Sequence, residues 1–310
     1  MTTISARGLY KVFGKDPQNA IAALENGASR EELMEKGSTA AVIDASFDVE
    51  PGEIFVIMGL SGCGKSTLIR MVNGLLPASG GTLEIDGTPL TEMSESQLRD
   101  LRRDKISMVF QHFALLPHRT VLQNAAYGLE IKGVPKAERD EKAHEALRMV
   151  DLDGWADYMP GELSGGMQQR VGLARALAAD TDVLLMDEAF SALDPLIRKD
   201  MQDQLIELQG KLNKTILFIT HDLNEAMRIG DRIAMMRSGR IEQIGTAEDI
   251  LQNPANNFVA DFVKDVDRAR VLTADNIAEQ PKETLGAGHG PLTAQKLLRE
   301  TQNPWLVVLN

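Results

Sequence analysis

The chain of 310 residues contains a single cysteine, Cys63, so no disulfide can form within it. A chain without disulfides fits a reducing compartment such as the cytoplasm. No apolar run approaches the ~20 residues that a membrane-spanning helix needs. The N-terminus also lacks the uninterrupted apolar core of a secretory signal. These absences predict a soluble, cytoplasmic protein.

Basic residues are outnumbered as well: 33 Lys and Arg stand against 45 Asp and Glu, which gives a net charge of −12. This balance argues against a broad nucleic-acid-binding surface, although it leaves room for a local basic patch. The hydrophobic share of 43% is ordinary for a globular protein, and the length suits one large or two modest domains. Composition alone does not reveal an activity.

Four short apolar runs are rich in β-branched residues and are continuous rather than alternating: 54–58, 106–110, 183–186 and 215–220. This pattern predicts strands covered on both faces of a parallel sheet. Each run is followed at once by a polar or glycine-rich segment. Because ligands of open α/β sheets bind at the carboxyl ends of the strands, we expect these four segments to meet at one edge.

Other elements surround this sheet. Amphipathic spacing predicts helices at 66–76, 165–179 and 196–212. Alternating stretches at 4–13, 41–49 and 82–90 predict half-exposed antiparallel strands, and 232–245 predicts a hairpin turning at Ser238-Gly239. Charge-rich helices at 95–104 and 136–150, grouped with 112–165, predict a helical insertion between two strands of the main sheet. Residues 15–38 interrupt the start with one small helix candidate, and 265–310 form a mixed tail.

Residues 59–67 match the phosphate-binding pattern G-x-x-x-x-G-K-[ST] between a strand and a helix. Its glycines let backbone N–H groups surround phosphate oxygens, and the following helix presents its positive end. Lysine at this position reaches the β- and γ-phosphates, and the serine hydroxyl ligates Mg²⁺. The plainer alternative is a glycine-rich turn that only caps a helix. The candidate ligands are Gly59, Ser61, Gly62, Cys63, Gly64, Lys65, Ser66 and Thr67.

Asp187 and Glu188 follow the apolar run VLLM. Asp187 is suited to hold Mg²⁺ through water, and Glu188 to orient or deprotonate an attacking water. An acidic pair after a strand can also be an ordinary solvated loop, but the phosphate loop upstream favours the catalytic interpretation.

Ser164, Gly165 and Gly166 begin a predicted helix and could form a second anion site. Two phosphate-binding elements in one chain suggest a head-to-tail homodimer in which each site is completed by the neighbouring copy. A helix merely capped by Ser-Gly-Gly is the alternative.

These motifs, together with Gln111, Ser191-Ala192-Leu193-Asp194 and His221, occur in the order and spacing of ABC-transporter nucleotide-binding domains. The LSGGQ-type signature is highly specific to that family, and Met167 here replaces its glutamine. The resemblance implies a P-loop NTPase (RecA-like) α/β core with antiparallel β and helical subdomains over residues 1–264. It also implies ATP and Mg²⁺ as ligands.

The same resemblance implies roles for single residues. Gln111 would link Mg²⁺ and the water site to the helical subdomain at 112–165, and His221 would contact the γ-phosphate. Asp194 joins the nucleotide-binding set on this ground. An aromatic residue near the N-terminus stacks on adenine in this family, and Phe13 fits that place best, with Tyr10 as the alternative.

A narrower resemblance, at 15–38, 109–130, 187–198 and 265–271, is to the motors of glycine betaine/proline/choline importers. It implies a peripheral protein at the cytoplasmic face of the membrane, with permease subunits and a periplasmic or extracellular binding protein as partners. Phe113, Leu115 and Leu116 would form the groove for a permease helix, or else pack internally. The tail is shorter than the CBS pair usual there. Motors for other solutes, exporters and non-transport ABC proteins are the alternatives.

Overall fold

The computed structural model describes residues 3–111, 114–191, 193–264, 284–286, 288–301 and 307–309. It divides into two compact units, 1–266 and 267–310. Within the second unit, β11 (Thr284–Gly286) and β12 (Val307–Leu309) pair in parallel, and α14 (Pro291–Thr301) lies between them in sequence. All predicted site residues belong to the first unit. None of the described helices combines the length and apolar character that crossing a bilayer requires.

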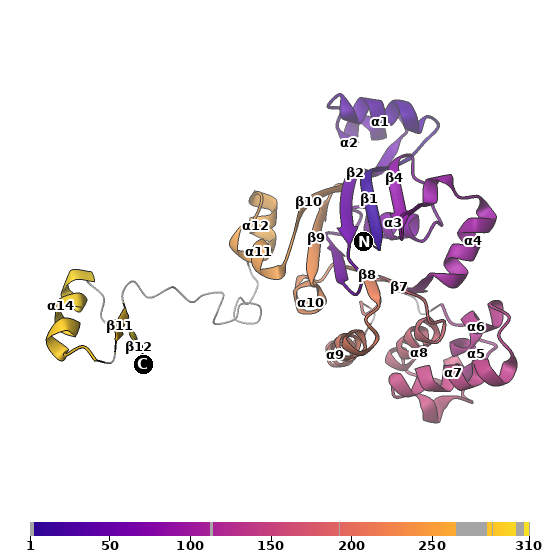
Figure 1. The fold of residues 1–310 in the computed structure, drawn as a ribbon. Coiled ribbons are helices and arrows are strands. Elements are labelled where there is room, and N and C mark those ends of the chain that lie inside the picture. Colours follow the sequence, from indigo (N-terminus) through magenta and orange to yellow (C-terminus); the bar gives the residue numbers. More distant parts are fainter. Residues whose placement is uncertain are drawn as a thin grey trace. The chain divides into compact units, whose positions relative to one another are not determined.

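The main sheet of the first unit has six strands in the order β10-β9-β3-β8-β7-β6 (Figure 1). All neighbours are parallel except β10, which pairs antiparallel with β9. The four predicted apolar runs are therefore adjacent strands, as expected. The bounds are β3 (Ile54–Met58), β6 (Ile106–Val109), β7 (Val183–Asp187), β8 (Thr215–Thr220), β9 (Arg232–Arg237) and β10 (Arg240–Gly245).

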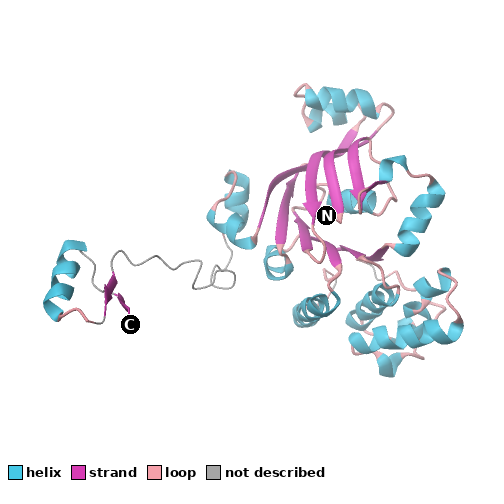
Figure 2. Cartoon of the chain, in the orientation of Figure 1, coloured by secondary structure: helices cyan, strands magenta, loops and turns pink. Residues whose placement is uncertain are grey.

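A second, antiparallel sheet has the order β2-β1-β4-β5 (Figure 2). Its strands are β1 (Ile4–Phe13), β2 (Thr39–Val49), β4 (Gly80–Ile85) and β5 (Thr88–Pro89), and η1 (Leu90–Glu92) follows. One buried cluster joins this sheet to the main sheet and to α3 (Lys65–Val72). The rings of Phe47 and Phe55, from the two sheets, stack with centroids 5.5 Å apart.

Helices after β6 form a separate group that packs on itself around α8 (Figure 1). It comprises α5 (Val121–Ala125), α6 (Tyr127–Ile131), α7 (Lys136–Met149), η2 (Asp153–Trp155), η3 (Pro160–Glu162) and α8 (Gly165–Ala178). The predicted helix at 95–104 is α4 (Glu95–Asp104), and grouping it with this insertion was wrong. It precedes β6, and its Leu98 and Leu101 pack against the cluster between the sheets.

The remaining helices precede β2 or follow β7 in the sequence. Residues 15–38 contain α1 (Pro17–Glu25) as well as α2 (Arg30–Glu35), where the sequence suggested one helix. Pro17 begins α1, and the Asp16 carboxylate caps it. The others are α9 (Pro195–Leu212), α10 (Leu223–Ile229), α11 (Ala247–Gln252) and α12 (Asn257–Val263).

The rings of Phe190 and Phe218 are fully buried, with centroids 5.6 Å apart. We expect Phe218→Ala to lower the free energy of unfolding by about 3–5 kcal/mol, because it removes apolar contact and leaves a cavity. Leu196→Ala is the control: its side chain is 70% exposed, so its loss should cost about 0.5 kcal/mol or less. Urea unfolding monitored by circular dichroism measures both. Equal effects would contradict a core position for Phe218.

Candidate functional site

The predicted convergence of polar segments at one sheet edge is present. The register pairs Met58 with Thr220 and Asp187 with Ile219, so the chain leaves β3, β7 and β8 at nearly the same level. The parallel neighbour β6 ends beside Met186. The segments that begin after these strands contain the phosphate loop, Glu188, His221 and Gln111.

The phosphate loop, residues 59–67, joins β3 to α3 and is held from two sides. Gly64 has φ +110°, and a Cβ there would come within 2.1 Å of the Ala41 carbonyl of β2. On the other side, the Cys63 carbonyl accepts a hydrogen bond of 2.9 Å from Gly239 at the hairpin tip. The backbone of the loop is therefore fixed by β2 and by the β9–β10 hairpin.

Residues of the loop differ in exposure to solvent. Ser61 and Gly62 are exposed, while Ser66 and Thr67 are half-buried. Cys63 belongs to the core cluster, and burial raises the pKa of its thiol. Cys63 can thus offer a ligand its backbone but not its side chain.

Lys65 is 4% exposed, and its ammonium group stays within the loop. Nζ donates to the carbonyl oxygens of Gly59 (2.9 Å) and Leu60 (3.2 Å) and lies 3.8 Å from Glu188 Oε1. A buried ammonium needs such acceptors to offset its desolvation. A cation is thereby positioned over the loop that Gly59 begins.

Ser66, in the first turn of α3, and Asp187, at the end of β7, meet directly. Ser66 Oγ donates to Asp187 Oδ1 at 3.0 Å. Burial raises the pKa of the Asp187 carboxyl, and the hydrogen bond from Ser66 opposes this shift. A buried carboxylate beside a hydroxyl provides the hard oxygen donors that Mg²⁺ prefers.

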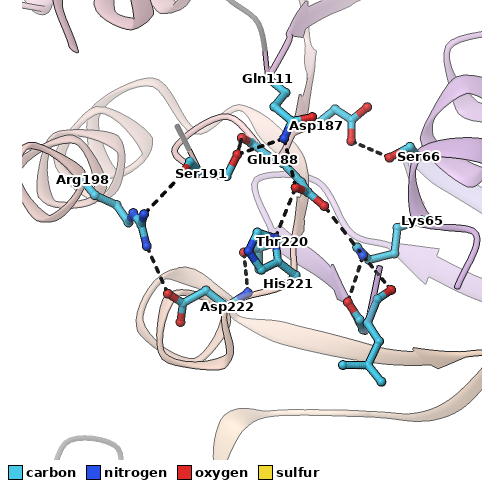
Figure 3. Close-up of polar contacts among 12 residues, drawn as sticks. Lys65, Ser66, Gln111, Asp187, Glu188, Ser191, Arg198, Thr220, His221 and Asp222 are labelled. Carbon is cyan, nitrogen blue, oxygen red and sulfur yellow. Dashed lines mark hydrogen bonds and ion pairs between the residues drawn. The ribbon is translucent and has the colours of Figure 1, made fainter. Parts of the chain in front are cut away.

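Glu188 contacts side chains from three other segments (Figure 3). Besides Lys65, Gln111 Nε2 donates to its Oε2 at 3.3 Å, and His221 Nδ1 lies 3.2 Å from the same oxygen. The backbone of Glu188 has φ +46°, an uncommon conformation for a residue with a long side chain. Such backbone strain is concentrated at functional sites.

A second set of contacts ties the segment after β7 to the segment after β8. The Arg198 guanidinium donates to the carbonyl oxygens of Ser191 (3.4 Å) and Leu193 (3.1 Å) and to Asp222 Oδ2 (3.3 Å) (Figure 3). Ser191 in turn donates to the Glu188 carbonyl at 2.9 Å and accepts from Gln111 at 3.3 Å. The residues that flank Glu188 and His221 are thus cross-linked.

The sequence pattern did not single out Arg198, Ser191 or Asp222 as individuals. Asp222 could have been found, because an aspartate just before an apolar-periodic segment is a helix-cap signal, and it does cap α10. Arg198 reads as an ordinary exposed helical residue, so only the folded chain reveals its partners.

Ser164 and the two glycines begin α8 as predicted. Ser164 Oγ caps the helix by accepting from the Met167 N–H at 3.4 Å. Gly166 packs against α9, since a Cβ there would lie 2.7 Å from Ile197 Cγ2. Among the described hydrogen bonds, none joins Ser164, Gly165 or Gly166 to the phosphate loop of the same chain. Asp194 is likewise a helix cap, accepting at 3.1 Å from Leu196 and Ile197.

The two aromatic candidates differ in exposure. Phe13 is 43% exposed at the end of β1 and lines a cleft of about 460 Å³ with Lys11 and Pro77. Its strand partner is Thr39, two residues before the Ala41 carbonyl that touches Gly64. Tyr10 is 8% exposed and packs in the cluster beneath α1 and α2. The Phe13 ring, over which Lys11 Nζ lies at 5.1 Å from the centroid, is more accessible for stacking than the buried Tyr10 ring.

Comparison with known proteins gives a consistent result. A sequence model of the ABC transporter family matches residues 42–191. The glycine betaine transport ATP-binding protein OpuAA of Bacillus subtilis is 57% identical over 96% of this chain and 71% of its own length. The glycine betaine/proline betaine transport system ATP-binding protein ProV of Escherichia coli is 52% identical over 99% of this chain and 78% of its own length.

The chain belongs to the ATP-binding proteins of ABC transporters.

Solved structures agree with this assignment. The bacterial ABC transporter cassette MJ0796, in its dimeric structure, is 32% identical and aligns with a TM-score of 0.67 over 78% of this chain and 98% of the cassette. The same cassette in a post-hydrolysis state bound to ADP and phosphate aligns with a TM-score of 0.66, 31% identity and the same coverage. This chain is accordingly an ATPase with the P-loop ABC fold.

The ABC ATPase also has a groove between its core and its helical group. It is lined from the core side by Arg102, Ile106 and Met108, and from the helical side by Tyr127 and Ile131. Leu115 and Leu116, which were predicted to line a docking groove, are half-buried and absent from its lining. Phe113 lies outside the described residues.

A buried acid supports the segment that contains His221. Glu225 of α10 is 5% exposed and accepts a 3.0 Å hydrogen bond from Gln202 of α9. Burial raises the pKa of this carboxyl, while hydrogen bonds from Thr220 and Gln202 partly oppose the shift.

We therefore predict that Glu225→Gln makes the ATPase more stable at pH 8 relative to the parent protein. The folded pKa lies above the unfolded one, so folding of the parent weakens as pH rises from the unfolded toward the folded value. Below the unfolded pKa both states are protonated and the two proteins should be alike. Urea unfolding between pH 4 and 8 tests this; a constant difference across that range would contradict it.

Proposed function

We propose that this ABC ATPase drives uptake of a small quaternary ammonium solute such as glycine betaine. The proposal rests on sequence identity, over nearly the whole chain, to ATP-binding proteins whose names specify such solutes. Relatives whose names include glycine betaine are 39–57% identical, those named for trimethylamine N-oxide 47–50%, and one named for choline alone 38%. Glycine betaine and choline each have a fully substituted, cationic nitrogen, as does trimethylamine N-oxide. The solute class is thus inferred from the relatives, whereas the chemistry of hydrolysis is inferred from the site.

Nucleotide phosphates would bind over the loop at 59–67. Backbone N–H groups of its glycines, the ammonium of Lys65 and the N-terminal end of α3 all favour negative charge there. The Lys65 ammonium now donates to two carbonyl oxygens of its own loop, so phosphate oxygens would compete for the same donors. The exposed Phe13 ring, which β2 connects to the loop, would stack on adenine.

Ser66 and Asp187 would hold Mg²⁺, which neutralises phosphate charge when bound. The 3.0 Å hydrogen bond between them supports this assignment. So does the burial of the Asp187 carboxylate, because a bound cation would offset the desolvation of its negative charge. The described residues contain no group of three or more His, Cys, Asp or Glu able to hold a metal. The nucleotide's own oxygens would therefore supply much of the coordination, with Gln111 close by.

Glu188 would accept a proton from the attacking water or orient it. Its carboxylate faces Lys65, Gln111 and His221, so it would lie beside the terminal phosphate. His221 would contact that phosphate, and Gln111 would transmit the presence of the phosphate to the helical group, whose first helix, α5, begins ten residues further on. Arg198 would keep the segments containing Glu188 and His221 in register.

A second copy of the chain would complete the site. Ser164, Gly165 and Gly166 form a helix start whose donors face no acceptor of their own phosphate loop, and the similar cassette MJ0796 was solved as a dimer. In a head-to-tail homodimer this helix would meet the partner's γ-phosphate. Asp194, beside it in the next helix cap, would take part in the same contact.

The assembly would lie on the cytoplasmic face of the membrane. The groove lined by Met108, Tyr127 and Ile131 joins the core to the helical group, so a permease helix seated there would respond to movement between them. A periplasmic or extracellular binding protein would deliver the solute to that permease.

The chemistry is tested with Glu188→Gln, which replaces the acceptor by an amide and leaves the phosphate cradle intact. We expect ATP to bind normally and turnover to fall by about 100-fold or more. The variant should also form a dimer with Mg-ATP and a monomer with ADP. Steady-state hydrolysis and light scattering measure these outcomes.

Lys65→Ala is the comparison variant and should lose tight ATP binding and the ATP-induced dimer together. Residual turnover of Glu188→Gln above about one-tenth of the parent rate, a barrier change of only ~1.4 kcal/mol, would remove Glu188 from the catalytic role. Equal mass with ATP and ADP would contradict the dimer.

The solute is tested by uptake of labelled glycine betaine and choline in cells that lack this gene. We expect glycine betaine uptake to fall to background and to return when the gene is restored, but not when the Glu188→Gln form is supplied. Choline uptake distinguishes a broad importer from a narrow one. Unchanged uptake of both solutes would refute the assignment while leaving the ATPase chemistry intact.

A further inference from the structure

The insertion at 15–38 is anchored beside the phosphate loop. Leu24 of α1 and Leu33 of α2 are buried against β1 and β2 in a cluster that includes Tyr10. Figure 1 shows both helices packed at one end of these strands. Gly14 and Ser38, at the two ends of the insertion, are in close contact, because a Cβ on Gly14 would lie 2.6 Å from Ser38 Oγ. The insertion is therefore a compact element with closed ends.

Arg30 extends from this element to the loop. Its Nη2 donates to the Gly62 carbonyl at 3.5 Å, and its Nε is buried with no hydrogen-bond partner. The proximity also affects Cys63: burial raises the pKa of that thiol, and the charges of Lys65 and Arg30 act in the opposite direction. Arg30 thus places a guanidinium group against the Gly62–Cys63 part of the loop.

Arg30 differs in its partners from three other half-buried arginines of the first unit. Arg198, Arg119 and Arg232 each pair with a carboxylate at 3.3 Å or less. No ion pair between Arg30 and a described residue exists, and the adjacent Glu32 carboxylate is turned to the backbone of Ser29 in the helix cap. The single contact to Gly62 uses one of five N–H donors of the group.

A planar cation with unused donors suits phosphate, as it suits carboxylate, because two parallel N–H groups bind two oxygens. The two cations at the loop are also separated. Lys65 reaches the carbonyls of Gly59 and Leu60, whereas Arg30 reaches that of Gly62. Lys65 and Arg30 therefore contact different parts of the same phosphate loop.

We propose that Arg30 is an additional phosphate-binding residue, through which the insertion contributes to nucleotide affinity. The proposal relies on the ATPase activity of the chain. Its ligand is the polyphosphate chain of ATP or ADP, not the base, because Arg30 lies at the phosphate loop and Phe13 lines a separate cleft.

The test compares Arg30→Ala and Arg30→Lys with Lys36→Ala in the full-length protein. Lys36 is exposed at the end of α2, so Lys36→Ala removes a charge of the same sign from the same insertion. We expect Arg30→Ala to raise the KM for ATP by about tenfold with kcat within about twofold, and Arg30→Lys to restore part of the loss. Lys36→Ala should match the parent.

Two further measurements separate phosphate binding from mere support of the loop. Pyrophosphate, which lacks the base, should inhibit Arg30→Ala less strongly than the parent by a factor similar to the change in KM. Thermal unfolding without nucleotide should be nearly the same for Arg30→Ala and Lys36→Ala. An unchanged KM and pyrophosphate inhibition would overturn the proposal. So would a lower nucleotide-free melting temperature accompanied by equal inhibition by pyrophosphate.

Discussion

The site depends on three parallel strands that end at nearly the same position along the strand direction. Because β3, β7 and β8 are hydrogen-bonded in register, the residues after them cannot shift along the strands independently. Lys65 and His221 are therefore brought to 3.8 Å and 3.2 Å from the Glu188 carboxylate without any covalent constraint. Burial adds the second requirement, since a buried ammonium and a buried carboxylate stabilise the fold only when each has partners. The same contacts that place the catalytic candidates also satisfy these charges.

Much of this arrangement could be predicted from the sequence, and the reason is local. Short continuous runs rich in β-branched residues favour strands buried on both faces, and glycines at 59, 62 and 64 meet conformational demands that other residues meet poorly. The four buried strands and the hairpin at Ser238-Gly239 accordingly agree with the structure, and the family agrees with the comparisons. Individual catalytic roles remain proposals that rest on geometry.

What the sequence did not predict depends on contacts between distant segments. Helix α4 has the same charged texture as α7, so only its packing through Leu98 and Leu101 separates it from the helical group. Tyr10 and Phe13 lie on one strand, and which ring is free depends on the helices that cover Tyr10. Arg198 and Arg30 are unremarkable in sequence because their partners lie on other elements.

The hairpin tip has a consequence for motion. Gly239 donates a hydrogen bond to the Cys63 carbonyl, and the Gly239 carbonyl accepts one from Ile43 of β2. Two residues before Ile43, the Ala41 carbonyl lies against Gly64. The phosphate loop, the hairpin and β2 thus form a closed circuit of backbone contacts. A closed circuit behaves as a stiff frame: its members move together or not at all. A displacement of the loop on binding would therefore carry β2 and the β9–β10 hairpin with it, which couples the antiparallel sheet to the edge of the main sheet.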